Sequence, residues 1–155
     1  MSTNPYAQFF GRPMRSEDID ELLETQGYGI LSLCGDGAPY SIPVSFGYDG
    51  ESIYLGLLDQ GAESTKMEYI EDGATVRLLV TDIRGRFDWQ SVAVTGPASR
   101  LDDGGTEREH CLETLVDNGW FMKAFERSDA IESLEGWKLE MEHVEGQEQT
   151  EEVHE

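Results

Sequence analysis

The segment Glu63-Ser64-Thr65-Lys66-Met67 places two hydroxyls and a lysine side by side. It follows an expected strand and opens an expected helix, where free backbone amides and the helix dipole favour an anion. Lys66 is one of only three lysines in the chain. We therefore expect Ser64, Thr65 and Lys66 to suit a phosphate group. The alternative is that Ser64 only caps the helix and that Lys66 is a solvated charge.

A second group of polar residues lies in segment 89–96, where polar and apolar side chains alternate. Gln90 or Ser91 is able to hydrogen-bond the edge of a ligand. The alternative is structural: Trp89 fills a core or an interface, and Gly96 marks a bulge or a bend.

Arg84 and Arg86 form the densest positive cluster of the chain, in an expected loop before that segment. Guanidinium groups pair well with phosphates and carboxylates, so the cluster suits a ligand or a partner of that kind. The alternative is that both arginines only solubilise a surface loop.

The strand expected over residues 39–48 has two different faces. Tyr40, Ile42, Val44 and Phe46 share one face, and Ser41, Pro43 and Ser45 share the other. The first face suits a core. Because Pro43 has no amide hydrogen, it marks a backbone position that is not paired to a neighbouring strand, and something else can bind there.

Cysteines and histidines show no metal-site spacing. Cys34 and Cys111 are far apart and form no CxxC pair, so we expect two buried thiols and neither a zinc site nor a disulfide scaffold. His110, His143 and His154 are isolated from one another, so no metal site is expected.

The elements that position these residues are mostly strands. Turn residues and side-chain periodicity predict a helix from Ser16 to Gly27, strands over 29–34, 39–48 and 52–58, a helix over 63–72, strands over 74–81 and 88–101 joined across 82–87, a helix over 105–127 and a strand over 136–144. This order indicates a mainly β protein with short helices (α+β). Six antiparallel strands with tight hairpins close most economically into a small barrel, because closure removes exposed edges.

Length and composition indicate one folded domain with an acidic surface. The chain has 155 residues, 38% of them hydrophobic and 10% aromatic, which is too apolar for a disordered chain. We expect one domain over residues 1–144 and an acidic, disordered tail over 145–155. The net charge of −21 would repel nucleic acid. It indicates either a salt-adapted (halophilic) surface or an ordinary acidic protein. No apolar run is long enough for a membrane span, so we expect a soluble cytoplasmic protein.

Residues 29–101 resemble the pyridoxamine 5'-phosphate oxidase-like FMN-binding split barrels. Ser64, Thr65 and Lys66 stand where that family has a Ser, Arg, Lys triplet, with Val76 ten residues after Lys66. Residues 91–101 read SVAVTGPASRL, similar to the family pattern of a polar residue followed by V-x-V-x-G-x-A-x-R-L. The triplet departs from the family pattern at Thr65.

The resemblance implies a six-stranded antiparallel split barrel that binds FMN. Ile42, Pro43, Val44 and Ser45 would then run along the flavin ring, Ser64, Thr65 and Lys66 would hold its phosphate, and Gln90 and Ser91 would complete the cofactor site. It also implies a homodimer with FMN in the cleft between the subunits, so that the Ser and Pro face of strand 39–48 looks toward the partner.

The end of the chain departs from true pyridoxamine 5'-phosphate oxidases. Where these enzymes have an arginine and histidine motif, the residues after Trp137 read KLEME and continue into glutamates. We therefore expect a flavin-binding relative and not the oxidase itself. The leading hypothesis is an oxidoreductase that passes electrons between a reduced nicotinamide or deazaflavin and a small acceptor, with no catalytic side chain identified. The alternatives are a non-catalytic flavin-binding or stress-related module, and a barrel that has kept only the fold.

Overall fold

Antiparallel strands closed into a ring form the centre of the protein. The computed structural model describes residues 11–34, 38–58, 71–118 and 134–150. Within them, the strands are β1 (Arg12–Pro13), β2 (Tyr28–Cys34), β3 (Pro39–Tyr48), β4 (Ile53–Leu58), β5 (Thr75–Gly85), β6 (Asp88–Arg100), β7 (Leu134–Leu139) and β8 (His143–Gln149). The helices are α2 (Ser16–Thr25) and α4 (Thr106–Asn118).

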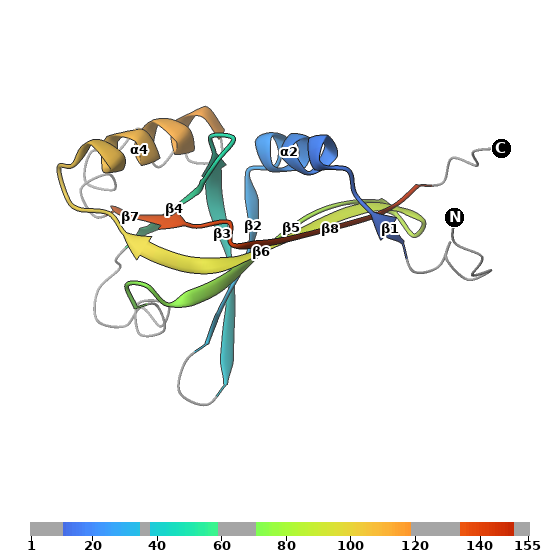
Figure 1. Cartoon of the computed structure of the whole chain (residues 1–155), viewed down its shortest axis with the longest axis horizontal. Coiled ribbons are helices and arrows are strands. Elements are labelled where there is room, and N and C mark those ends of the chain that lie inside the picture. The colour runs from blue at the N-terminus through green and yellow to red at the C-terminus, as the bar shows by residue number, and fades with distance from the viewer. Residues whose placement is uncertain (1–10, 35–37, 59–70, 119–133, 151–155) are drawn as a thin grey trace.

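The ring runs β6-β5-β2-β3-β4-β7 and closes where β7 pairs with β6. Each pair of neighbouring strands in the ring is antiparallel. The predicted mainly β, six-stranded antiparallel barrel is therefore confirmed. Strands β8 and β1 extend the sheet beyond the ring (Figure 1).

One edge of β6 is divided between two partners. Its first part pairs with β8, from Trp89 opposite Gln149 to Thr95 opposite His143. Its last residues pair with β7, from Ala98 to Arg100. The chain passes from β7 to β8 directly over Gly96, where a Cβ would collide with the carbonyl oxygen of Glu140. A glycine is required at this crossing because only a residue without a side chain leaves room for that carbonyl.

Two expectations about the C-terminal region are wrong. The single strand expected over 136–144 is two strands, interrupted at Glu140 and the two residues after it. Residues 145–149, expected to belong to a disordered acidic tail, complete β8. Gly146 lies beneath the side chain of Ile19, and Glu148 is buried, so alternate residues of this acidic segment face the protein. Residues 151–155 lie outside the described residues.

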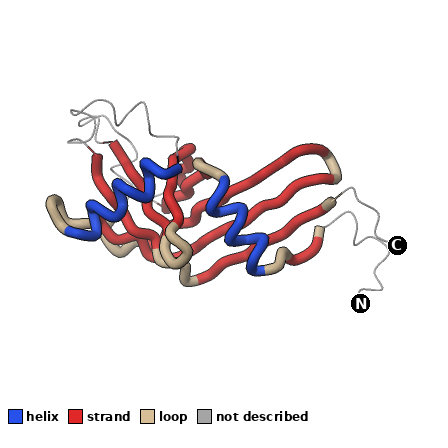
Figure 2. The backbone as a smooth tube through the Cα atoms, turned by 90° about the horizontal axis from the view of Figure 1, so that it is seen from above, coloured by secondary structure: helices blue, strands red, loops and turns tan. Residues whose placement is uncertain are grey.

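The two helices pack on different parts of the sheet. Figure 2 shows them lying across the strands on the same side of the molecule. Helix α2 buries Leu22 and Leu23 in the main core. Helix α4 packs on β3, β4 and β7 through a smaller cluster that includes Cys111 and Leu115. Val116 of the same helix is 43% exposed.

The strands joined by the expected loop 82–87 are longer than predicted. Strand β5 continues to Gly85, and only Arg86 and Phe87 form the turn. Ile83 pairs with Trp89 across the hairpin, and such cross-strand contacts stabilise a longer ladder. No helix of the described residues is long and apolar enough to cross a membrane.

Candidate functional site

Strand β3 leaves part of one edge open. It pairs with β2 from Pro39 to Ser45, but with β4 only from Phe46 to Tyr48. Among the described residues, the backbone of 39–45 therefore has a strand neighbour on one side only. This open stretch is the β3 edge that we consider as a binding site.

The hydrogen-bond alternation shows which residues serve the β3 edge. The backbone N–H of Phe46 donates to the carbonyl of Gly27 at 3.2 Å, so Phe46 faces β2. In an antiparallel pair, every second residue does the same. The backbone groups of Ser41, Pro43 and Ser45 consequently face the open side. The 3.0 Å contact between the hydroxyls of Ser32 and Ser41 agrees, because residue pairs without mutual backbone bonds bring their side chains closer.

Pro43 occupies a position where no ladder bond to β2 is lost. Its nitrogen faces the β3 edge, so the missing N–H removes a donor from that edge and leaves the β2–β3 ladder intact. Within the part of the chain that the structure describes, Pro43 thus has no strand partner on this side, as its missing N–H led us to expect. Four residues of this strand were predicted to bind the cofactor. The backbone groups of Pro43 and Ser45 face the β3 edge, whereas the side chains of Ile42 and Val44 point toward the core.

The β3 edge adjoins an apolar surface that we call the outer face, made by Tyr28, Ile30, Pro43 and Leu79. The register places Pro43 opposite Ile30 and Ile30 opposite Leu79, so all three side chains point to the same side of the sheet. Tyr28 is 43% exposed, and Ile30 and Leu79 are each 37% exposed. Both described helices pack elsewhere, on the core side of the sheet extension and outside β4 and β7.

Gln90 and Ser91 point to opposite faces of β6. The side-chain amide of Gln90 donates to Glu148 at 3.2 Å, and the other carboxylate oxygen of Glu148 accepts from Arg12 at 3.1 Å. Gln90 therefore helps to hold β8 and β1 against β6. Ser91 lies opposite Thr81 on the same side as the outer face. It is three strand spacings, about 14 Å, from Ser45.

The predicted phosphate-binding residues Ser64, Thr65 and Lys66 lie outside the described residues. The structure thus brings Pro43, Ser45 and Ser91 to one face of the sheet, and it places Gln90 on the other.

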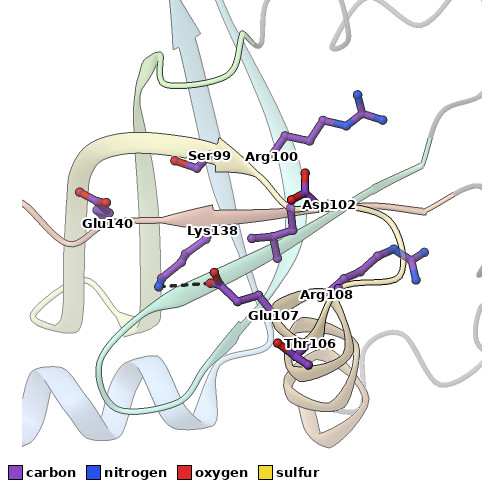
Figure 3. A pocket seen from close by; sticks show the side chains of 10 residues that line it. Ser99, Arg100, Asp102, Thr106, Glu107, Arg108, Lys138 and Glu140 are labelled. Carbon is purple, nitrogen blue, oxygen red and sulfur yellow. Dashed lines mark hydrogen bonds and ion pairs between the residues drawn. The ribbon is translucent and has the colours of Figure 1, made fainter.

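A hollow of about 370 Å³ lies between the end of β6, the start of α4 and β7 (Figure 3). It is lined by Ser99, Arg100, Leu101, Asp102, Gly105, Thr106, Glu107, Arg108, Lys138 and Glu140. The basic groups have acidic counterparts: Lys138 lies 3.4 Å from Glu107, and Arg108 lies 3.9 Å from Asp103. Because these charges balance locally, we do not assign the hollow to a cofactor. Its residues are distant in sequence, so no sequence motif could have revealed it.

The turn between β3 and β4 is bonded to both helices. His110 Nε2 of α4 lies 2.8 Å from Asp49 Oδ2, and the Tyr48 hydroxyl donates to Asp20 of α2 at 2.6 Å. Partial burial, followed by the hydrogen bond to Asp20, raises the pKa of Tyr48. Burial alone would raise the pKa of Asp49, but hydrogen bonds from His110, Ser52 and Glu51 outweigh it and lower that pKa. A turn between the strands over 39–48 and 52–58 was expected from the sequence, whereas its bonds to the two helices were not.

The cysteines behave differently from each other. Cys111 is buried, and burial raises the pKa of its thiol to about 11, so the thiol stays protonated. Cys34 is exposed at the end of β2, so the expectation that both thiols are buried is wrong for Cys34. Strand alternation explains this, since Leu33 points to the core and its neighbour points outward. In the described part of the chain, no three His, Cys, Asp or Glu side chains gather as metal ligands.

Comparisons with known proteins agree with this architecture. A family model described as pyridoxamine 5'-phosphate oxidase matches residues 15–148. The uncharacterized protein RA0666 of Rhizobium meliloti (strain 1021) is 24% identical over 92 residues. The match covers 59% of this chain and 58% of that relative, which is less than two thirds of its length.

Solved structures share the fold. A FAD-binding protein from Mesorhizobium loti has a TM-score of 0.70 at 23% identity, covering 88% of this chain and 96% of that one. The FAD and heme binding protein from Mycobacterium smegmatis has a TM-score of 0.69 at 19% identity, covering 91% and 74%. Since the family model spans residues 15–148 and the ring of strands is shared with these structures, the chain belongs to the pyridoxamine 5'-phosphate oxidase family.

Proposed function

We propose that this protein is a homodimeric flavoprotein that binds FMN along the β3 edge and acts as an oxidoreductase. Electrons would pass between a reduced nicotinamide or deazaflavin and a small acceptor. The observation that carries the proposal is the backbone of Ser41, Pro43 and Ser45, which has a strand neighbour on one side only among the described residues and lies beside an exposed apolar surface.

The groups at the β3 edge fit a flavin ring. The pyrimidine part of the ring carries two carbonyl acceptors and one N–H donor. The edge offers the carbonyls of Ser41, Pro43 and Ser45, together with the N–H groups of the two serines. Backbone groups on a strand are held rigidly by the sheet, so they are well placed for an edge-on ligand. The apolar outer face beside them suits the aromatic faces of the ring.

The outer face supports a second copy of the chain as partner. Contiguous exposed apolar side chains usually mark an interaction site, and Tyr28, Ile30 and Leu79 form such a group. Ser91 lies about 14 Å from Ser45 on the same face of the sheet. Two subunits facing each other could bring Ser91 of one toward the β3 edge of the other.

The relatives support a flavin as the cofactor. The Mesorhizobium protein is described as FAD-binding and the Mycobacterium protein as binding both FAD and heme. The choice of FMN rests on the resemblance of Ser64, Thr65 and Lys66 to a phosphate-binding triplet. Bound FMN would supply hydride and electron transfer, while the protein would bind the ring, orient it and exclude water. A flavin-binding module without turnover is the alternative.

Ligand titration tests the proposal. The purified chain, its spectrum recorded first, is titrated with FMN and with riboflavin, which lacks the phosphate. Ser45→Trp should raise the Kd of both ligands at least about tenfold, because the indole would fill the outer side of the β3 edge. Lys66→Ala should weaken FMN about 10- to 100-fold and leave riboflavin unchanged, because a charged hydrogen bond contributes about 1.5–3 kcal/mol.

Two control variants complete the experiment. Glu109→Trp introduces the same side chain at an exposed site of α4, and Lys138→Ala removes a lysine at the charge-balanced hollow; both should bind FMN normally. A heme spectrum, or FMN affinity unaffected by Ser45→Trp, would contradict the proposal. Stoichiometric oxidation of a nicotinamide or deazaflavin with an acceptor would favour the oxidoreductase over the module without turnover.

A further inference from the structure

The tip of the β5–β6 hairpin exposes large apolar side chains. Ile83 is 72% exposed and Phe87 is 42% exposed. The register of β2 with β5 ends at Leu79 opposite Ile30, so β5 beyond that point has β6 as its strand neighbour among the described residues. The hairpin therefore projects past β2, as the long arm in Figure 2 shows. Such side chains on a projecting arm are exposed to any partner that covers this side of the sheet.

The hairpin continues the outer face. Leu79, Thr81 and Ile83 alternate along β5 and point to the same side of the sheet. Ile83 is about 13 Å beyond Leu79 along the strand. A partner seated on Ile30 and Leu79 would therefore meet Ile83 as well.

The tip also carries two arginines, Arg84 and Arg86, beside Asp82 and Asp88. Arg84 pairs with Asp82 of the same hairpin at 2.9 Å. Arg86 is exposed, and it makes no ion pair with another residue that the structure describes. The whole chain has 32 acidic and 11 basic residues, so a second copy presents mostly carboxylates. The charge of Arg86 is consequently complementary to the acidic surface of a second copy.

We propose that the hairpin tip is a contact element of the homodimer, in which Ile83 and Phe87 become buried against the second copy and Arg86 pairs with its carboxylates. The inference rests on the proposed homodimer and adds a specific element to it. In a two-fold dimer each subunit contributes the same tip, so the contact occurs twice. A substitution at one tip residue therefore removes two contacts from the dimer and affects its dissociation constant twice.

Sedimentation equilibrium of the full chain with FMN, at 0.1 M and 1 M KCl, tests this contact. Ile83→Ser combined with Phe87→Ser should raise the dimer Kd about 100-fold, because four large apolar side chains lose their burial per dimer. Arg86→Glu should raise the Kd about tenfold at 0.1 M KCl and much less at 1 M, where charges are screened. Circular dichroism verifies that these exposed substitutions leave the fold intact.

Two further variants separate the hairpin from the rest of the dimer. Arg15→Glu makes the same charge change on an arginine that is 75% exposed at the start of α2, and it should leave the Kd unchanged. Leu79→Glu should give monomers, because it places a charge in the centre of the outer face. Hairpin variants that dimerise like the wild type, while Leu79→Glu is monomeric, would overturn the hairpin contact and leave the homodimer standing. A monomeric wild type would overturn both.

Discussion

At the scale of single residues, Asp49 has the largest number of described bonds around the β3–β4 turn. Its carboxylate accepts from the backbone N–H groups of Glu51 at 2.9 Å and Ser52 at 2.7 Å, and it contacts His110 at 2.8 Å. The ring of His110 in turn meets Tyr54 edge-on, with ring centroids 5.2 Å apart. One side chain thus shapes the turn and attaches α4 to it.

Replacing Asp49 should remove a pH-dependent part of the stability. The folded state lowers the pKa of Asp49 below its usual 3.8, which means that folding favours the ionised carboxylate. This contribution is fully present above the unfolded-state pKa, and it is lost as the pH falls through the lowered folded-state pKa. Asp49→Asn should therefore lower the free energy of unfolding by about 1–3 kcal/mol at pH 7 and by clearly less at pH 3.

Urea unfolding at the two pH values measures this difference. Asp103→Asn is the matched control, because Asp103 is 81% exposed and its contact with Arg108 is long, at 3.9 Å. That substitution should change the free energy of unfolding by less than about 0.5 kcal/mol. An equal cost of Asp49→Asn at pH 7 and pH 3 would show that the ionised form of Asp49 is not what the turn stabilises.

Single residues also show how far the sequence predicts the candidate site. The missing amide hydrogen of Pro43 indicated a backbone position that, among the described residues, has no strand neighbour on one side. This could be read from the sequence because the missing hydrogen is a property of the residue itself. Gln90 and Ser91 could not be separated, because strand alternation says that they face opposite sides without saying which side is covered. The partner of Gln90 is Glu148, 58 residues away, and such contacts depend on the whole fold.

At the scale of elements, helix docking depends on residues without side chains. A Cβ on Gly47 of β3 would lie 2.5 Å from Thr114 of α4, and a Cβ on Gly146 of β8 would lie 2.8 Å from Ile19 of α2. Both distances are shorter than van der Waals contact allows. Each helix thus approaches the sheet where a glycine leaves space.

Strand β8 should contribute measurably to stability although it is acidic. A chain ending at Val144 would lose the β6–β8 ladder beyond that residue, the Glu148 contacts to Gln90 and Arg12, and the Gly146 surface under α2. Several net hydrogen bonds of about 0.5–1.5 kcal/mol each suggest a loss of at least about 3 kcal/mol. The melting temperature should fall by about 6 °C or more.

Thermal unfolding and amide hydrogen exchange in 1 M KCl test this expectation, since salt limits the effect of removing carboxylates. Amides of residues 89–93 in β6 should exchange faster in the shortened chain. Amides shared by β4 and β7, on the other side of the ring, serve as internal controls and should keep their protection. Equal melting temperatures and equal protection would mean that β8 adds nothing to the fold.

Most strands follow from side-chain alternation, but their ends do not. Trp137, Leu139 and Met141 alternate without interruption, so the sequence predicts one strand where the structure has two. The break arises from the crossing over Gly96, a contact between segments that are more than forty residues apart. Likewise, β5 extends to Gly85 because β6 returns alongside it, a long ladder that turn signals alone do not predict.

At the scale of the whole molecule, negative charge opposes folding. The net charge is −21 over 155 residues, and the described ion pairs are largely at the surface. Exposed pairs of this kind contribute little, so they do not offset the repulsion. A surface adapted to high salt and the surface of an ordinary acidic protein differ in how the stability of the fold responds to added salt.

Stability should therefore rise with salt. The Debye length falls from about 10 Å at 0.1 M to about 3 Å at 1 M, which screens repulsion between carboxylates. We expect the free energy of unfolding to rise by about 2 kcal/mol between 0.1 and 1 M KCl, equivalent to a melting temperature about 4–8 °C higher. Calorimetry over a KCl series measures it, and sucrose, which acts by exclusion without screening, is the control. A melting temperature that stays constant or falls would favour the ordinary acidic protein.

The barrel itself was predictable because hairpins and the number of strands leave few closed arrangements. The site that we propose between two subunits was not predictable from the side-chain pattern, since such an interface depends on surfaces that a single chain's pattern does not place. The β3 edge could be inferred from Pro43, whereas the exposure of Ile30 and Leu79 emerged only when the neighbouring strands were assembled.

The crossing at Gly96 has a consequence for strand alignment. Side-chain alternation repeats every two residues, so a two-residue slip of β6 would still turn its apolar side chains inward. Such a slip would bring Val94 or Ala98 beneath the carbonyl oxygen of Glu140, where no Cβ fits. Gly96 therefore excludes the shifted alignments of β6 by steric collision. Because β6 pairs with both β5 and β7, its alignment also determines how the ring of strands can close.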